Sequence, residues 1–560
     1  MADILVSPIV ELLGSNLTSL ISTEFGLLYG VKKDLEKLSS TLDTVRSVLD
    51  DAETKQIKDK LIGDWLRKLK DAAYEAENIM DDCALEFQRT DAKLQLKINN
   101  LTTINRKLET VEILNLKKCR NLKMLPKNLS NMRKLRKLEI GSDIYKDINN
   151  IEDPKLTHMP LGIGELTCLK QLSTFVVSQL SDSVGIQELE KLNHLEGILT
   201  IKGLQYVPDP RDAYKANLRS KENLLSLHLK WPVGVSDVDV GIECNNSKEV
   251  LEALKPHANV KQLCIYGYPG VMLPGWVGSS TALPKLTFLG LFFMPNVEGW
   301  SSECLLLPSC LDTLILFNCP KLKLSTPLPS SITDLSVGKG NDPSLKLVEK
   351  LPNLSVLRIM GFDEVETLPE APLRNLTRLR YLDIYDCDKL KRLPTEHRYG
   401  GLESTIQRLG IHRCGGLESL TEGLQNLTSL KELRVYNCRS LKSLSESSLQ
   451  HLTALEKLII MGCQELEIML VDFQHLISLK ELELAWLPQL MSLPEEIQHA
   501  RRLQALEIEG CKNLRKLPEW LLELPALTSL CVINCHPELH RRCEDWNRIP
   551  HLRVENHVEL

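Results

Sequence analysis

Eight cysteines occur at the same place in a repeating pattern of leucines, and this repeat constrains the fold more than any other feature. The pattern reads L-x-x-L-x-L-x-x-C, as in Leu379, Leu382, Ile384 and Cys387. The cysteines at this marker position are Cys119, Cys319, Cys387, Cys414, Cys438, Cys463, Cys511 and Cys535. From Cys387 the position recurs after 27, 24, 25, 24, 24 and 24 residues, with Leu487 occupying it once. Such a period is typical of a solenoid with one short strand per repeat.

This motif with this period is that of a leucine-rich repeat, and it predicts an α/β solenoid of horseshoe form. The first clear unit begins at Val111, so we assign residues 111–534 to the repeats and 535–560 to a C-terminal cap. A long solenoid offers a concave surface for binding, and it does not by itself bring a catalytic site.

The earlier repeats are less regular than the later ones. They keep the strand motif but vary the return segment, and residues 231–247 predict a surface loop rich in Val, Gly and Asp. Residues 260–276 contain Tyr266, Tyr268 and Trp276. These three aromatic residues fit either a second contact site or local packing.

Bulk composition argues against several classes of function. The net charge of −6 disfavours nucleic acid as a partner, because phosphates require a basic protein surface. There is no run of about 18 apolar residues, so we expect no stable membrane span. The N-terminus lacks the basic segment of a signal peptide, and cysteines at a small apolar position are typical of reduced, buried thiols. We predict a cytoplasmic protein, with peripheral membrane attachment as an alternative.

Residues 1–97 follow a helical pattern instead of the repeat. Apolar residues between positions 31 and 49 step by four and three, which places them on one helix face. A second stripe over residues 62–83 includes Trp65 and Leu69. Short connections between amphipathic helices predict an antiparallel bundle. The segment contains 13 Lys and Arg against 18 Asp and Glu, so it is acidic.

Residues 65–82 read WLRKLKDAAYEAENIMDD. This segment resembles the N-terminal coiled-coil domain, of the Rx type, of plant nucleotide-binding leucine-rich-repeat disease-resistance proteins. The resemblance implies that Glu77, Asp81 and Asp82 form the acidic motif that packs against the receptor's own repeats, with Asn78 in the place of a second acid. From the residues alone, a solvated charged face remains open.

The C-terminus resembles the same family. The sequence CHPEL at residues 535–539, followed by Arg542-Cys543 and by EDW at 544–546, is similar to the family's terminal cap. The cysteines and histidines here lack the paired C-x-x-C spacing of a zinc site, so we assign no metal.

In that family a nucleotide-binding module separates the bundle from the repeats. Here residues 98–110 form only a short junction where that module is absent, because a βαβ unit needs a longer chain. The phosphate-binding motif G-x-x-x-x-G-K-[ST] does not occur in the sequence. We therefore predict no binding of ATP or ADP and no cofactor.

Strand alternation predicts which repeat residues face a ligand. The leucines of the motif point into the core, so the residues between and beside them form three columns on the concave face. Tyr and Arg are frequent interface anchors, and a basic-aromatic patch beside an acidic one fits a protein ligand. The residues that we predict to bind protein are Tyr381, Asp383, Tyr385, Arg408, His412, Glu432, Arg434, Tyr436, Lys457, Glu481, Glu483, Glu507 and Glu509.

The resemblance implies a non-catalytic recognition protein of plant defence. Its concave face would bind a pathogen effector or a host protein, and residues 1–97 would contact this chain's own repeats or a full-length receptor. A substrate adaptor for ubiquitin ligation and a non-functional remnant are the alternatives. No Ser/His/Asp grouping, metal motif or phosphate loop supports an enzyme.

Overall fold

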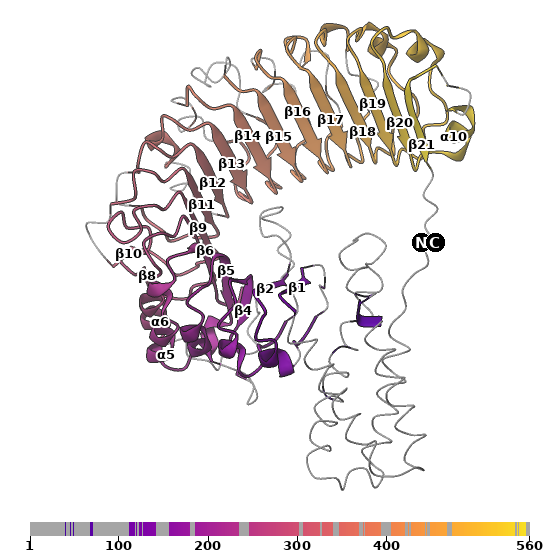
Figure 1. The fold of residues 1–560 in the computed structure, drawn as a ribbon. Coiled ribbons are helices and arrows are strands. Elements are labelled where there is room, and N and C mark those ends of the chain that lie inside the picture. The colour runs from indigo at the N-terminus through magenta and orange to yellow at the C-terminus, as the bar shows by residue number, and fades with distance from the viewer. Residues whose placement is uncertain are drawn as a thin grey trace, which may run out of the picture. The chain divides into compact units, whose positions relative to one another are not determined.

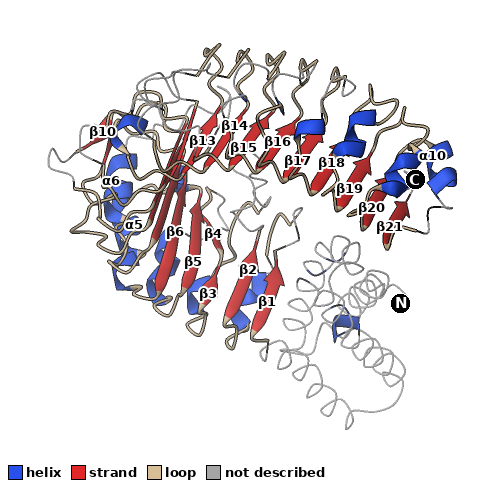
Figure 2. Ribbon diagram, turned by 90° about the horizontal axis from the view of Figure 1, so that it is seen from above, coloured by secondary structure: helices blue, strands red, loops and turns tan. Residues whose placement is uncertain are grey.

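The computed structural model describes most residues between 111 and 555, with gaps, together with Ser40, Val45, Leu49, Leu66 and residues 68–70. The chain divides into two compact units. The first comprises Met1–Val277 and Thr281–Lys285, and the second comprises Gly278–Ser280 and Leu286–Leu560. Figures 1 and 2 show that parallel strands lie side by side within each unit and are joined by return segments.

In the first unit, β1, β2 and β3 form one parallel sheet, and β4 to β7 pair in parallel in chain order. The strands are β1 (Ile113–Leu116), β2 (Lys137–Ile140), β3 (Gln171–Leu172), β4 (Thr174–Val176), β5 (Gly197–Lys202), β6 (Leu224–Lys230), β7 (Gln262–Tyr266) and β8 (Met272–Leu273). The helices are η2 (Lys127–Asn131), η3 (Ile163–Glu165), η4 (Ile186–Lys191), η5 (Leu204–Tyr206), α5 (Pro210–Lys215), η6 (Leu218–Ser220) and α6 (Ser247–Ala253).

In the second unit, β9 and β11 to β21 pair in parallel in chain order. The strands are β9 (Phe288–Phe292), β10 (Gly299–Trp300), β11 (Thr313–Phe317), β12 (Asp334–Gly338), β13 (Val356–Met360), β14 (Tyr381–Tyr385), β15 (Arg408–His412), β16 (Glu432–Tyr436), β17 (Lys457–Met461), β18 (Glu481–Ala485), β19 (Ala505–Glu509), β20 (Ser529–Ile533) and β21 (His551–Glu555). The helices are η7 (Val348–Lys350), η11 (Phe473–His475), η12 (Glu495–His499), η13 (Glu519–Glu523) and α10 (Pro537–Cys543).

The repeat leucines form the core, as the motif predicts. In β14 the second and fourth residues, Leu382 and Ile384, are 3% and 0% exposed, and the marker residue Cys387 is also buried. The leucine-rich-repeat solenoid is therefore confirmed. Burying one leucine side chain contributes roughly 1.5–3 kcal/mol, and the parallel strands satisfy the backbone between repeats.

The marker cysteines are buried thiols that donate to backbone carbonyls. The Sγ atom of Cys511 lies 3.5 Å from the carbonyl oxygen of Glu509 and 3.7 Å from that of Leu484, in the preceding repeat. Burial raises the pKa of the Cys511 thiol to about 12. All twelve cysteines whose side chains the structure describes are free thiols.

The residue just before the marker position has a left-handed backbone in the later repeats. Its N–H donates to the carbonyl at the end of the next strand, for example from Trp486 to Glu509 at 2.7 Å. Asn, Asp and Gly, which tolerate this conformation, hold most of these positions, whereas Arg413 and Trp486 do not fit that preference. The residues and their φ values are Asn318 (54°), Asp386 (52°), Arg413 (52°), Asn437 (54°), Gly462 (70°), Trp486 (54°), Gly510 (63°) and Asn534 (52°).

The aromatic residues of residues 260–276 pack locally. Tyr266, Tyr268 and Trp276 are 4%, 0% and 4% exposed. The hydroxyl of Tyr268 donates to the carbonyl of Met272 at 3.1 Å, and Trp276 Nε1 donates to that of Leu251 at 3.2 Å. Of the two interpretations, the structure therefore favours packing over a second contact site.

Two other predictions concern segments that lie mostly outside the described residues. Most of the predicted bundle, including Glu77, Asp81 and Asp82, lies outside them. The described residues of that segment are helical, and Leu49 and Leu66 are fully buried. Residues 234–245 of the predicted surface loop are also outside them, and residues 231 and 247 at its two ends are buried.

Candidate protein-binding face

We use the term strand face for the surface formed by the first, third and fifth residues of the five-residue strands in the second unit (Figure 1). The strands pair in register, so equivalent residues form columns. Tyr381 pairs with Arg408, and Arg408 pairs with Glu432. The same register holds through β19, so all thirteen residues selected from the sequence lie in columns on the six adjacent strands β14 to β19.

Three aromatic rings stack across β14, β15 and β16. The rings of Tyr385 and His412 have centroids 4.3 Å apart and planes 16° apart. The rings of His412 and Tyr436 have centroids 4.8 Å apart and planes 15° apart. Stacking restrains all three side chains, so this part of the strand face is ordered before any ligand binds.

A second contact joins β14 to β15 in the column formed by the first residues of the strands. The guanidinium carbon of Arg408 lies 4.4 Å from the centroid of the Tyr381 ring. The same guanidinium lies 3.7 Å from Oδ2 of Asp383, which is 5% exposed. Gly410 makes room for this arrangement, because a Cβ at that position would overlap the Asp383 carboxylate and lie 2.8 Å from Nε2 of His412.

The arginines of the strand face all have acidic neighbours. Arg358 Nη1 lies 2.6 Å from Oδ1 of Asp334. Arg434 Nη2 lies 2.7 Å from Oε1 of Glu432. The basic-aromatic patch expected from the sequence is therefore not basic, because the charges of Arg358, Arg408 and Arg434 are matched by those of Asp334, Asp383 and Glu432. The surface is aromatic and internally neutralised.

Burial shifts the titration of several of these groups. It raises the pKa of the Asp383 carboxyl, against the opposing effect of Arg408. It lowers the pKa of His412 to about 4, aided by the nearby charges of Arg413 and Arg434. The His412 ring is therefore neutral near pH 7, which suits its position between two tyrosine rings.

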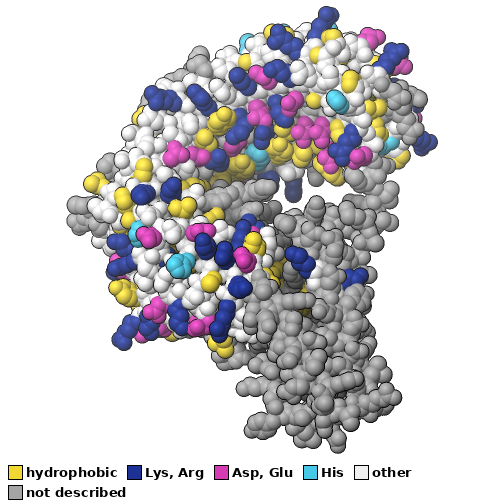
Figure 3. Space-filling model, in the orientation of Figure 1, with side chains coloured by type: hydrophobic (Ala, Val, Ile, Leu, Met, Phe, Trp, Pro, Cys, Tyr) yellow, Lys and Arg dark blue, Asp and Glu magenta, His cyan; other side chains and the backbone are white. Residues whose placement is uncertain are grey.

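The strand face changes character from β17 onward, where carboxylates dominate. Lys457 forms an ion pair with Glu481. Glu483, Glu507 and Glu509 form no ion pair with any cation in the part of the chain that the structure describes. The pKa of Glu483 is raised by burial and then by the negative charges of Glu507 and Glu509. Figure 3 shows Asp and Glu side chains gathered over these strands.

Two further residues belong to this surface, Arg358 on the strand face and Trp486 at its border, and the repeat pattern did not predict them. Arg358 lies on β13, whose repeat has Phe362 in place of the marker cysteine, so the cysteine signal does not identify it. Trp486 directly follows β18 and is 45% exposed. Its left-handed backbone cannot be read from the residue type, since tryptophan rarely adopts it.

The histidines of the C-terminal cap have local structural partners. His536 Nδ1 accepts from the N–H of Glu538 at 3.1 Å, at the start of α10. His540 Nε2 accepts from the N–H of Cys535 at 3.1 Å. In the described part of the chain, no group of three or more His, Cys, Asp or Glu residues could hold a metal ion.

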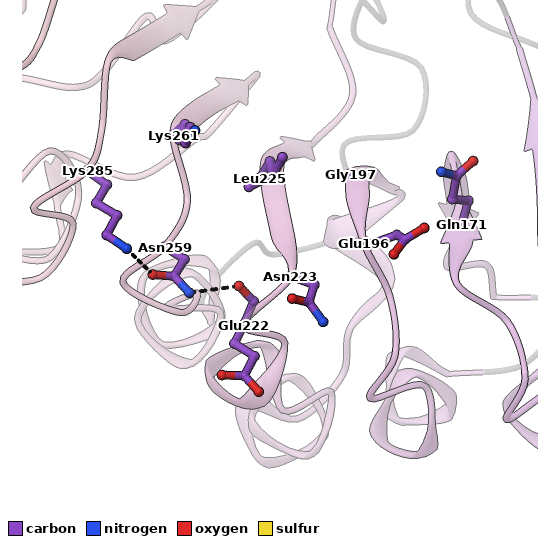
Figure 4. Close-up of a pocket in the computed structure, with 9 residues that line it drawn as sticks. All are labelled: Gln171, Glu196, Gly197, Glu222, Asn223, Leu225, Asn259, Lys261 and Lys285. Carbon is purple, nitrogen blue, oxygen red and sulfur yellow. Dashed lines mark hydrogen bonds between the residues drawn. The ribbon is translucent and has the colours of Figure 1, made fainter.

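A polar hollow of about 550 Å³ lies in the first unit, near the beginnings of β3, β5, β6 and β7 (Figure 4). Lys285 Nζ donates to Asn259 Oδ1 at 2.8 Å, and Asn259 Nδ2 donates to the carbonyl of Glu222 at 2.9 Å. These bonds link successive repeats, so the side chains serve the scaffold. We assign this hollow no ligand.

Comparison with known protein families covers both parts of the chain. Residues 9–120 match the Rx N-terminal domain. Residues 186–319 match R13L1/DRL21 leucine-rich repeats, and residues 337–464 and 404–536 match the leucine-rich repeats described as plant disease resistance protein RPS2-like. The chain is a relative of plant disease-resistance proteins. The resemblance noted in the sequence is thereby confirmed.

Individual relatives agree with this assignment. Putative disease resistance protein RGA1 of Solanum bulbocastanum is 32% identical over an alignment of length 290, and the match covers 43% of this chain and 28% of RGA1. Disease resistance protein RGA2 of the same species is 33% identical over an alignment of length 269, and the match covers 41% of this chain and 27% of RGA2. This chain thus spans less than a third of the length of RGA1 and of RGA2.

Solved structures give weaker likenesses. The TLR13–ssRNA13 complex is 16% identical with a TM-score of 0.43, covering 80% of this chain and 69% of that one. The leucine-rich repeat domain of the effector XCV3220 (XopL) is 24% identical with a TM-score of 0.32, covering 41% and 77%. At TM-scores this low neither likeness adds to the argument. Among the described residues of this chain, no helix is long and apolar enough to cross a membrane.

Proposed function

We propose that this chain is a non-catalytic recognition protein of plant defence whose strand face, from β13 to β20, binds a protein ligand. One observation carries the proposal: the stacked rings of Tyr385, His412 and Tyr436 lie on the same three adjacent strands as the Arg408 guanidinium over the Tyr381 ring. Tyrosine and arginine dominate the energetic centres of protein interfaces.

The physical state of this cluster supports binding over a purely structural role. The Tyr385, His412 and Tyr436 side chains are half-buried, so each retains exposed surface. They are also held by one another, which reduces the side-chain entropy that a ligand would otherwise have to overcome, about 0.5–1.5 kcal/mol for each side chain. The paired arginines add directional donors without a net charge.

The relatives support a pathogen effector or a host protein as the ligand, since they are disease-resistance proteins. For residues 1–97 we propose contacts with this chain's own repeats or with a full-length receptor, through Glu77, Asp81 and Asp82. We place the protein in the cytoplasm. Each of these assignments rests on the family and not on a contact in the described residues.

We further infer that the chain joins bundle and repeats without a nucleotide-binding module. The first repeat strand, β1, begins at Ile113, close behind the predicted end of the bundle at residue 97. We therefore expect no heat of binding in a calorimetric titration with ADP. A saturable micromolar site would contradict this inference.

The binding proposal is tested by a variant that removes two rings, Tyr385→Ala with Tyr436→Ala. Affinity-tagged protein is incubated with extract of infected leaves, and the retained proteins are identified by mass spectrometry. We expect the double variant to lose specific partners. The control is Tyr214→Ala, which changes a tyrosine that is 61% exposed on α5, outside the strand face.

Two outcomes would count against the proposal or redirect it. If the double variant remains folded by circular dichroism and retains the same partners as the wild type, the strand face is not the binding site. If the retained proteins are core subunits of a ubiquitin ligase, the adaptor alternative replaces the defence receptor.

A further inference from the structure

The two halves of the strand face differ in charge. From β12 to β16, each arginine has a carboxylate neighbour, as in Arg358 with Asp334 and Arg434 with Glu432. From β17 to β21, five carboxylates face two cations. The carboxylates are Glu481, Glu483, Glu507, Glu509 and Glu555, and the cations are Lys457 and Arg553.

The two cations are already engaged. Lys457 pairs with Glu481, and Arg553 pairs with Glu555 through two hydrogen bonds of 2.8 Å. The remaining carboxylates, Glu483, Glu507 and Glu509, stand on adjacent strands in paired register. Like charges so placed repel each other, and a cation that binds among them relieves the repulsion.

Small side chains leave space beside these carboxylates. The first column of this half continues from Glu481 into Ala505 and Ser529, both half-buried. The equivalent position in β14 is occupied by Tyr381. A ligand side chain therefore meets less protein bulk over β19 and β20 than over β14.

An exposed tryptophan borders the same surface. Trp486 follows Ala485, which pairs with Glu509, and the N–H of Trp486 donates to the Glu509 carbonyl at 2.7 Å. Its two neighbours in the row of left-handed residues are Gly462 and Gly510, and a Cβ on Gly510 would lie 2.6 Å from the Trp486 ring. The indole ring thus lies against a glycine and remains 45% exposed. Tryptophan is the aromatic side chain that attracts cations most strongly.

The negative charge of this surface also distinguishes between its possible binding partners. The chain's own N-terminal segment, residues 1–97, contains 18 acidic against 13 basic residues, so it carries the same sign as this surface. A nucleic acid is excluded by the same argument. The complementary occupant is a cationic segment of another protein.

We propose that the strand face from β17 to β20 binds a lysine- or arginine-bearing segment of a partner protein, with Glu483, Glu507 and Glu509 forming its ion pairs and the Trp486 ring packing on one of its cations. This names the chemistry of part of the ligand and rests on the proposed function. In that arrangement the stacked rings on β14 to β16, the aromatic half of the strand face, supply packing area. The carboxylates on β18 and β19, in its acidic half, select a partner of positive charge.

The test uses the full chain and a fluorescent nonapeptide of alternating arginine and serine, with alternating glutamate and serine as its counterpart. Fluorescence anisotropy at low and at physiological salt measures binding. We expect the cationic peptide to bind, with affinity that falls as salt rises, and the acidic peptide not to bind. If the cationic peptide does not bind at low salt, the proposal is wrong.

Matched variants distinguish this surface from general attraction to an acidic protein. The triple variant Glu483→Gln, Glu507→Gln, Glu509→Gln should weaken binding of the cationic peptide by about tenfold or more. The control triple Glu495→Gln, Glu496→Gln, Glu519→Gln removes the same charge from exposed positions on η12 and η13. Equal weakening by both triples would show non-specific adhesion and overturn the proposal.

A separate variant tests the tryptophan. Trp486→Asn keeps a residue suited to the left-handed backbone, so the fold is retained. We expect it to weaken binding of the cationic peptide several-fold, and unchanged binding would remove Trp486 from the proposal. The two proposals can fail separately in the capture experiment with leaf extract. If neither glutamine triple changes the captured partners while Tyr385→Ala with Tyr436→Ala abolishes capture, the proposed function stands and the inference of a cationic partner segment is wrong. If neither set affects capture, both fail.

Discussion

The imidazole ring of His412 stacks on the ring of Tyr436, with centroids 4.8 Å apart and planes 15° apart. Tyr385 covers the opposite side of the imidazole. This sandwich explains why the histidine is neutral in the folded protein, because burial and two neighbouring arginines disfavour its charged form. It also gives the strand face a dependence on pH that can be measured.

We predict that His412 weakens the fold in acid. Its pKa is about 4 in the folded chain and near 6.5 when unfolded, so the unfolded state takes up the proton first. Stability from this group is complete above pH 6.5 and is lost as pH falls toward 4, by on the order of 2 kcal/mol. Urea unfolding at several pH values compares the wild type with His412→Phe, which keeps a neutral stacked ring. The same acid dependence in both proteins would contradict the prediction.

Gly510 should tolerate no side chain while Trp486 is present. Gly510→Ala adds a Cβ 2.6 Å from the indole ring at a φ of 63°, so we expect a loss of about 2–3 kcal/mol in unfolding free energy. Combined with Trp486→Asn, the same substitution should cost only about 1 kcal/mol, from the backbone alone.

Gly197 is the control for that backbone effect. Its φ is 76°, and no atom lies within 4 Å of the position where its Cβ would stand. Gly197→Ala should therefore also cost about 1 kcal/mol. If Gly510→Ala costs the same with and without Trp486, the indole ring is not what excludes the side chain.

Lys221 should stabilise the first unit as a buried donor. Its Nζ donates to the carbonyls of Leu189 and Leu192 at 2.8 and 3.0 Å, at the end of η4. Lys221→Met leaves these carbonyls without that donor, and we expect a loss of about 1–3 kcal/mol at pH 7 by chemical denaturation. The exposed Lys191→Met should change stability much less than Lys221→Met does.

The same lysine has a signature in alkali. Burial lowers its pKa to about 8 in the folded chain, so between pH 8 and 10.5 the unfolded state holds the proton that the folded state has lost. Its contribution to stability should therefore rise with pH across this window. The stability difference between wild type and Lys221→Met should grow from pH 8 to pH 10, and a constant difference would refute the assignment.

The marker cysteines should resist alkylation in the native protein. Cys414 and Cys438 are fully buried, whereas Cys168 and Cys310 are exposed. The hydrogen bond with Cys387, followed by burial, also raises the pKa of the Cys414 thiol, which lowers the fraction present as the reactive thiolate. Iodoacetamide labelling followed by peptide mapping should find the exposed pair modified in buffer and the buried pair only in urea. Labelling of Cys414 at the rate of Cys168 would show that the repeat core opens.

Much of the strand face was predictable from the sequence because strand geometry is strict. A strand alternates its side chains with a period of two, so the positions of Leu382 and Ile384 in the core place Tyr381, Asp383 and Tyr385 on the other side. The same strand motif in each repeat then aligns these residues with those of the next strand. No other information was needed to obtain the columns.

The charge of the face was not predictable in the same way. The sequence shows Arg408 and Arg434 but not that each lies near a carboxylate, since that depends on rotamers and on which column each side chain leans toward. Tyr268 and Trp276 could have been surface or core, and only packing against the return segments buried them.

By itself, the sequence determined the period, the parallel strands and the core of this protein, because a repeated pattern of leucines can be buried in only one register. The tertiary structure alone decided that the aromatic half is neutralised, that the acidic half keeps unpaired glutamates among its described residues, and that Trp486 stands exposed in a left-handed turn. Several of these features depend on side chains about 24 residues apart in the chain, as for Arg358 and Asp334, and local patterns do not encode those distances.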